Sequence, residues 1–180
     1  RKSGAMIKTF DIKIPLILAL NLCYVYIIST LNTEISPYVY IMLPAVFIVP
    51  PALFLNFLPA MFVVAFSALI NEVVMPVRTG LVCALWLSCA YVVHNQRFRF
   101  RTLDAFSIIS LMLVLNFSIL LLYALFLPSG CAGTAEYFYR VAIDVSVSSA
   151  VLIAISKFTV TLPADIMRVL GVDISVAEGD

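Results

Sequence analysis

Long apolar runs separated by short polar segments are the main pattern of this chain. The runs cover residues 14–31, 38–74, 80–93, 105–127 and 141–160. A helix needs about 20 mostly apolar residues to cross roughly 30 Å of hydrocarbon, because each residue advances it by about 1.5 Å. The pattern therefore predicts an all-α integral membrane protein.

The second run is too long for one crossing, since a single helix over 38–74 would measure about 55 Å. Pro50, Pro51, Asn56 and Pro59 interrupt it, and proline removes a helical hydrogen-bond donor. The run therefore predicts a helical hairpin. The expected spans are 14–31, 38–55, 58–75, 80–96, 104–127 and 141–160, in one bundle over residues 1–163, and the tail 164–180 is a short cytoplasmic segment whose apolar residues suit the membrane surface.

The distribution of positive charge favours six crossings with both termini in the cytoplasm. In that arrangement only Arg78 and Arg140, of 11 Lys and Arg residues, lie outside. Five crossings would place Arg97, Arg99 and Arg101 outside, against the excess of positive charge found in cytoplasmic loops. We therefore expect a compact six-transmembrane-helix bundle.

Composition narrows the class of protein further. Hydrophobic residues make up 63% of the chain, charged residues 12%, and the mean hydropathy is +1.11. Soluble domains have about 45–50% apolar and about 25% charged residues, so a soluble enzyme and a disordered segment are excluded. The net charge of +1 provides no field to attract nucleic acid.

The sequence holds no recognisable catalytic motif. It has one histidine, no glycine-rich phosphate loop, no nucleophile elbow and no His/Cys spacing typical of zinc. It therefore predicts a protein that is not an enzyme and has no cofactor or metal site.

Glu72 is the most informative charge, because it stands in the last turn of the third expected span. Ala68 and Ala65 precede it on the same helical face, and small residues let another helix approach closely. A buried intramembrane carboxylate predicts a functional or partner-binding site. Alternatively, Glu72 lies at the membrane interface and pairs with Arg78 or with water.

Arg97, Arg99 and Arg101 alternate with two phenylalanines at the inner end of a span. Anionic lipid attracts such an inner-face basic patch by about 1 kcal/mol for each group. The patch therefore predicts a topology anchor on membrane lipid or, alternatively, a docking site for a cytoplasmic partner.

Small residues recur at every fourth position of the sixth expected span. They are Ala142, Ser146, Ala150 and Ala154, and we call them the small-residue stripe. Their spacing places them on one helical face, where they allow close helix packing. The stripe packs inside this bundle or, alternatively, binds a helix of a partner protein.

Asn21 and Asn116 fall near the middles of the first and fifth spans. Asparagine at such positions predicts interhelical hydrogen bonds worth about 0.6 kcal/mol each. Arg140 and Asp144 are one helical turn apart and are expected to pair locally.

The segment from Phe62 to Arg101 resembles the MreD family, the membrane subunits of the bacterial rod shape-determining machinery (elongasome). An acidic residue, Glu72, ends the third span, a short turn ends at Gly80, and the basic-aromatic loop 97–101 follows the next span. Ala65, Ala68 and Glu72 stand where the family usually has glycines and an aspartate.

This resemblance implies a non-enzymatic, multi-pass scaffold of the bacterial cytoplasmic (inner) membrane that acts in cell shape and peptidoglycan synthesis. Such a subunit would bind MreC and, with it, help organise the RodA glycosyltransferase, its transpeptidase partner and the MreB filament. Glu72 and Arg78 would be positions of the family pattern, with no chemical role to carry over.

The six-helix plan is also similar to the substrate-binding S components of energy-coupling-factor (ECF) vitamin transporters. That alternative implies docking through small residues of the first span. Here the first span has only Ala19 and Ser29, without a small-xxx-small pair. Because the small-residue stripe lies on the sixth span, the scaffold remains the first expectation.

Overall fold

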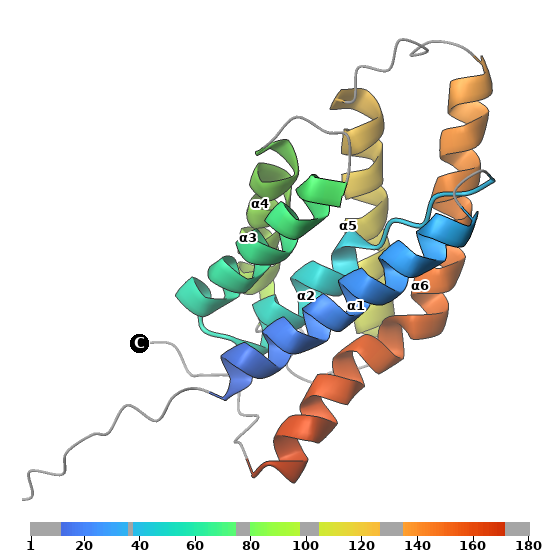
Figure 1. Cartoon of the computed structure of the whole chain (residues 1–180). Coiled ribbons are helices and arrows are strands. Elements are labelled where there is room, and N and C mark those ends of the chain that lie inside the picture. The colour runs from blue at the N-terminus through green and yellow to red at the C-terminus, as the bar shows by residue number, and fades with distance from the viewer. Residues whose placement is uncertain (1–11, 36–37, 75–79, 98–104, 127–134, 172–180) are drawn as a thin grey trace, which may run out of the picture.

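The computed structural model describes residues 12–35, 38–74, 80–97, 105–126 and 135–171. Within these ranges the regular structure is entirely helical (Figure 1). The helices are α1 (Lys13–Ile35), α2 (Pro44–Phe54), α3 (Phe57–Val74), α4 (Leu81–Gln96), α5 (Ala105–Phe126) and α6 (Ala135–Val169).

Helices α1, α5 and α6 are each long and apolar enough to cross a membrane. The other apolar helices are shorter, and α2, with 11 residues, measures only about 16 Å. The helix lengths and composition therefore indicate a helical membrane protein, as the sequence predicted.

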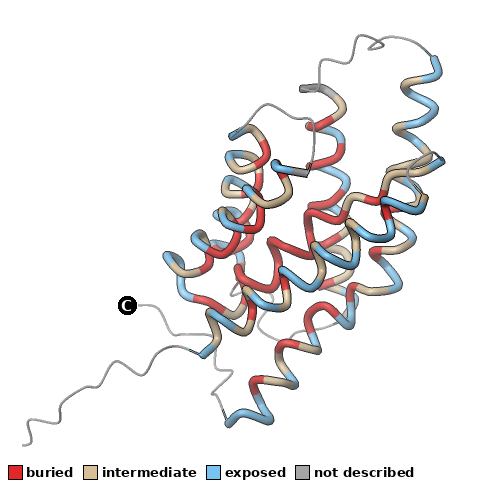
Figure 2. The backbone as a smooth tube through the Cα atoms, viewed as in Figure 1, coloured by how far each residue is buried: buried red, intermediate tan, exposed pale blue. Residues whose placement is uncertain are grey.

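Helix α2 lies at the centre of the fold, and each of the other helices packs against it. Every residue from Pro44 to Leu53 is buried, and Figure 2 shows this central red helix among outer helices with exposed faces. A helix that is apolar on all sides is stable only where other elements cover every face. The five outer helices provide that cover.

Successive helices run in alternating directions, so that α1 begins and α6 ends at the same end of the molecule (Figure 1). Within the long second run the chain turns at Leu55 and Asn56, and α2 packs against α3. The predicted helical hairpin therefore forms, with its turn a few residues after the paired prolines.

Pro50 and Pro51 lie inside α2 rather than breaking it. Pro51 has no N–H to donate to the carbonyl of Phe47, four residues earlier. Asn21 of α1 supplies the missing donor, because its Nδ2 donates to Phe47 O at 3.3 Å and to Ser67 Oγ of α3 at 3.0 Å. The interhelical hydrogen bonding predicted for Asn21 is confirmed, and it explains how α2 tolerates this proline.

Helices α2 and α6 differ most from the predicted boundaries; α6 begins at Ala135 rather than at residue 141, and α1 also continues to Ile35 rather than ending at residue 31. Helix α2 begins at Pro44 rather than near residue 38, because residues 38–43 approach it in a non-helical conformation. Helix α6 includes Pro163 and continues to Val169, so residues 164–169 belong to it rather than to a separate tail. Hydrophobicity did not predict these boundaries. For α2, the residues before the helix are as apolar as the helix itself. For α6, the two ends of the helix carry polar residues and so lie outside the apolar run.

Candidate functional site

A non-helical segment, residues 38–43, connects α1 to α2, and polar side chains of other helices hold it. Asp144 Oδ1 accepts the N–H of Tyr40 at 2.9 Å, and Ser148 Oγ accepts that of Met42 at 3.0 Å. Both acceptors lie on α6, more than 100 residues later in the chain. Buried non-helical backbone needs such partners, because its N–H and C=O groups have none within a helix. We call residues 38–43 the extended segment.

Asn32 of α1 binds the same segment from the other side. Its Nδ2 donates to Ile41 O, and its Oδ1 accepts the N–H of Ile41, each at 2.8 Å. This reciprocal pair resembles the bonding of a neighbouring β-strand, so one side chain satisfies both backbone groups of a buried residue.

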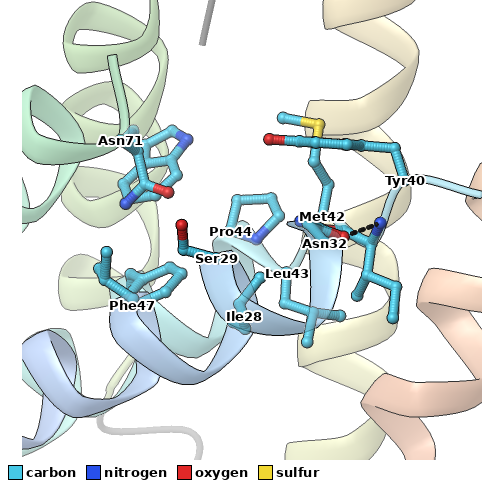
Figure 3. A pocket seen from close by; sticks show the side chains of 12 residues that line it. Ile28, Ser29, Asn32, Tyr40, Met42, Leu43, Pro44, Phe47 and Asn71 are labelled. Atoms are coloured by element: carbon cyan, nitrogen blue, oxygen red, sulfur yellow. Dashed lines mark hydrogen bonds between the residues drawn. The ribbon is translucent and has the colours of Figure 1, made fainter. Parts of the chain in front are cut away.

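Two cavities flank the extended segment, and Tyr40 and Met42 line both of them. The smaller, of about 30 Å³, lies against α1 and α2; Figure 3 shows Asn71 and Phe47 across it from Tyr40 and Met42. That volume accommodates water rather than an organic ligand.

The larger cavity, of about 220 Å³, lies between the end of α5 and the first part of α6. Tyr123 comes from α5, Tyr137 and Asp144 come from α6, and Tyr40 closes a third side. Apolar side chains complete the wall. We call it the Asp144 cavity.

A third hollow, of about 540 Å³, is an open groove between α4 and α5. Val92, Leu111 and Val114 are among its mostly apolar lining. An open and mostly apolar groove offers few polar groups to orient a polar ligand.

Glu72 is buried, with 7% of its surface exposed, and caps α4. Its Oε2 accepts the N–H of Gly80 and its Oε1 accepts that of Cys83, both at 2.9 Å. Gly80 has φ 92°, in the left-handed region that favours glycine. A carboxylate at this position satisfies donors that a helix N-terminus leaves unpaired and interacts favourably with the helix dipole. Glu72 thus joins α3 to α4, a role the sequence did not suggest.

Arg97 is also buried, and its Nη1 donates to Leu55 O at 3.3 Å. One turn earlier, His94 Nδ1 donates to Ala52 O at 3.2 Å. These carbonyls lie at the C-terminal end of α2, where a helix leaves acceptors unpaired and favours positive charge. Arg97 therefore caps α2, a contact that the sequence did not predict, while its place in the inner-face basic patch stays a prediction.

Three residues predicted from sequence, Arg78, Arg99 and Arg101, lie outside the described residues. The proposed pairing of Glu72 with Arg78 and the remainder of the basic patch stay predictions.

The small-residue stripe of α6 is exposed along its whole length, at Ala142, Ser146, Ala150 and Ala154. The buried positions of α6 lie elsewhere around the helix and include Ser148, Leu152, Ser156 and Thr159. Packing of the stripe inside this bundle, one of the two interpretations, is therefore wrong for this chain. The other interpretation, contact with a helix of a partner, stays a prediction.

Asn116 differs from Asn21. It is completely buried on α5, and in the part of the chain that the structure describes neither its Oδ1 nor its Nδ2 has a hydrogen-bond partner. The interhelical hydrogen bond predicted for Asn116 is wrong.

An aromatic group connects the central helix to α4 and α5. Trp86 stacks on Phe47 with ring centroids 5.5 Å apart, and its Nε1 donates to the hydroxyl of Tyr123 at 2.7 Å. The sequence reasoning missed this group and the roles of Asn32 and Ser148. For Ser148 a signal existed, since Asp144 and Ser148 put two polar groups on one face of an apolar helix.

These features define the class of protein. It is a helical membrane protein built around a buried central helix, and side chains of α1 and α6 hold the extended segment that precedes this helix.

Among the described residues, no group of three or more His, Cys, Asp or Glu side chains could hold a metal ion. The chain matches no protein-family model, no curated protein and no solved structure.

Proposed function

We propose that this chain is a non-enzymatic scaffold subunit of the elongasome, a protein of the MreD type in the bacterial inner membrane. It crosses the membrane six times with both termini in the cytoplasm. It binds an MreC-type protein and, through it, the RodA glycosyltransferase, its transpeptidase partner and an MreB-type filament.

The arrangement of charge and helix direction supports the six crossings. Lys13 begins α1, Arg97 follows α4 and Arg168 lies near the end of α6, and these three helix ends are at the same end of the molecule (Figure 1). Positive charge concentrates on the cytoplasmic side of membrane proteins.

The observation that carries the proposal is the exposure of the small-residue stripe. Lipid chains are as apolar as leucine, so association in the membrane depends on close packing, and small residues permit it. Four of them in register on the outer face of α6 form a smooth surface over about three helical turns. Such a surface suits a single transmembrane helix of a partner such as MreC.

The cavities favour the scaffold over the alternative, an S component of an ECF-type vitamin transporter. Pockets for drug-sized ligands usually measure roughly 300–1,000 Å³. The cavities beside the extended segment measure about 30 and 220 Å³, and the larger groove is open and mostly apolar. A vitamin would therefore lack an enclosed polar site.

Co-purification with an MreC-type protein tests the proposal. Ala150→Leu adds bulk in the middle of the stripe and should reduce recovery of the partner about tenfold or more, because the helices can no longer approach. Ala19→Leu is the matched control, since Ala19 is an exposed alanine of the first helix. Thermal unfolding of both variants should match the unmodified protein, since both sites are exposed.

The same pair of variants separates the two functions. Under the S-component alternative, Ala19→Leu would weaken docking to the transporter module, and mass spectrometry of the purified protein would find a bound vitamin. Undiminished binding of an MreC-type protein by the Ala150→Leu variant would overturn the role given to the stripe.

A further inference from the structure

We propose that the Asp144 cavity binds a small organic ammonium cation. This inference does not depend on the scaffold role, because the cavity lies away from the exposed stripe. It rests on the shape of the cavity, on one carboxylate and on three tyrosines that line it.

Three separate parts of the chain build the cavity. Tyr137, Val141, Asp144 and Val145 share one face of α6, since they are spaced by four, three and one residues. Tyr123 and its neighbours contribute the end of α5, and Tyr40 and Met42 of the extended segment line another side, while the cavity stays partly open to the surface. A volume of about 220 Å³ holds a small organic ion rather than a drug-sized molecule.

The negative charge of the Asp144 carboxylate indicates that a ligand of the cavity would be a cation. An ionised carboxylate within a membrane bundle is costly unless an opposite charge or several donors compensate it. Asp144 accepts one neutral backbone N–H, from Tyr40, which does not balance its charge. Arg140, one turn earlier on α6, does not line the cavity, and the residues that do line it include no Lys, Arg or His. A cation in the cavity would therefore gain a carboxylate partner.

The aromatic lining makes an organic cation the best fit. Tyrosine rings attract ammonium groups, and such aromatic surroundings recognise quaternary ammonium ligands. The hydroxyl of Tyr123 accepts the Trp86 N–H, and that of Tyr137 donates to Ala124 O at 3.1 Å, so both rings are held in place. Calcium needs six to eight oxygen ligands, and one carboxylate does not supply them. The apolar remainder of the wall suits N-alkyl groups.

Tetramethylammonium, titrated into the purified full-length protein, tests this inference. Trp86 is the only tryptophan of the chain and is hydrogen-bonded to Tyr123 of the cavity wall, so its fluorescence should change saturably. Sodium at equal ionic strength and tert-butanol, a neutral molecule of similar shape, are the controls. Neither should give a saturable change.

Asp144→Asn is the informative variant, because asparagine keeps an oxygen that can accept the Tyr40 N–H but removes the charge. Its apparent affinity for tetramethylammonium should fall about tenfold or more. Ser148→Ala, which removes the neighbouring bond to Met42 and leaves the cavity charge intact, should bind within about twofold of the unmodified protein. Should Asp144→Asn fail to fold, Val141→Phe fills the same cavity without changing its charge and should abolish the response.

An unchanged affinity in either Asp144→Asn or Val141→Phe would overturn the inference, as would an equal response to tert-butanol. The natural ammonium group is carried either by a free amine or by a lipid headgroup, and nanodiscs distinguish these sources. A lower apparent affinity for tetramethylammonium in phosphatidylethanolamine than in phosphatidylglycerol indicates that a lipid headgroup competes. Equal saturable affinities in both indicate a free amine.

Discussion

At the scale of single residues, Glu72 shows how a charge in an apolar segment can serve the fold itself. Both of its carboxylate oxygens accept backbone N–H groups at the start of α4. These groups have no helical partners of their own, because the first turn of any helix leaves its donors unpaired. The carboxylate therefore determines where α4 begins relative to α3.

Substitution of Glu72 tests this role. Glu72→Ala leaves two partly buried donors without an acceptor and should lower the free energy of unfolding by about 2 kcal/mol. Glu72→Gln retains one acceptor oxygen and should cost less. The measurement is thermal unfolding in detergent, with Glu34→Gln, an exposed position of α1, as the control. A stable Glu72→Ala protein that lost its partner would instead support a direct binding role for Glu72.

Asn21 and Asn116 show why the hydrogen bonding of a single side chain is hard to predict from sequence. Both are buried amides near the middle of apolar helices, yet Asn21 bonds to two other helices while the described residues offer Asn116 no hydrogen bond. The difference depends on what lies opposite each residue. The carbonyl released by Pro51 faces Asn21, and that proximity follows from the packing of α1 against α2.

At the scale of elements, the extended segment is the most unusual part of the fold. Asn32, Asp144 and Ser148 replace the hydrogen bonds that a helix or a strand partner would supply. Buried backbone groups without hydrogen-bond partners are costly, so these three side chains stabilise the segment.

Asn32→Leu tests the contribution of α1 to the extended segment. The substitution leaves both backbone groups of Ile41 without their partner and should destabilise the protein by about 2–4 kcal/mol. Hydrogen exchange at the Ile41 amide should accelerate at the same time. Asn95→Leu, at an exposed position of α4, is the matched control and should leave both measurements nearly unchanged. Unaltered exchange at Ile41 in the Asn32→Leu protein would show that other groups hold the segment.

The apolar runs predicted which parts of the chain are helical, and the hairpin within 38–74 followed from its length. Hydrophobicity did not predict the late start of α2, because Ile41, Met42 and Leu43 are as apolar as the helix that follows. The Asp144 cavity could not be predicted from the sequence either. It needs Tyr40 beside Asp144, a contact over 104 residues that no local spacing indicates.

At the scale of the whole molecule, the alternating helix directions divide the helix ends into two sets. The end of α1 and the start of α6 lie at one end, and the end of α4 and the end of α6 lie at the other (Figure 1). Six crossings require these two sets to face opposite sides of the membrane.

Single cysteines in a background without the native cysteines test this arrangement. Glu34→Cys and Glu136→Cys should react with a membrane-impermeant maleimide in intact cells, because both positions are exposed at the outer end. Asn95→Cys and Asp165→Cys should react only in inside-out vesicles. Labelling of all four positions from one side would show that the helices do not cross as proposed.

The dependence of the extended segment on α6 has a consequence for biosynthesis. Ribosomes deliver the chain from its N-terminus, so residues 38–54 reach the insertion machinery long before Asp144 and Ser148 exist. Until then the backbone N–H groups of Tyr40 and Met42 must rely on water or on the machinery itself, since their acceptors have not been made. The segment before α2 can therefore reach its final hydrogen bonding only after α6 has been translated. A chain truncated before α6 would lack the acceptors for Tyr40 and Met42.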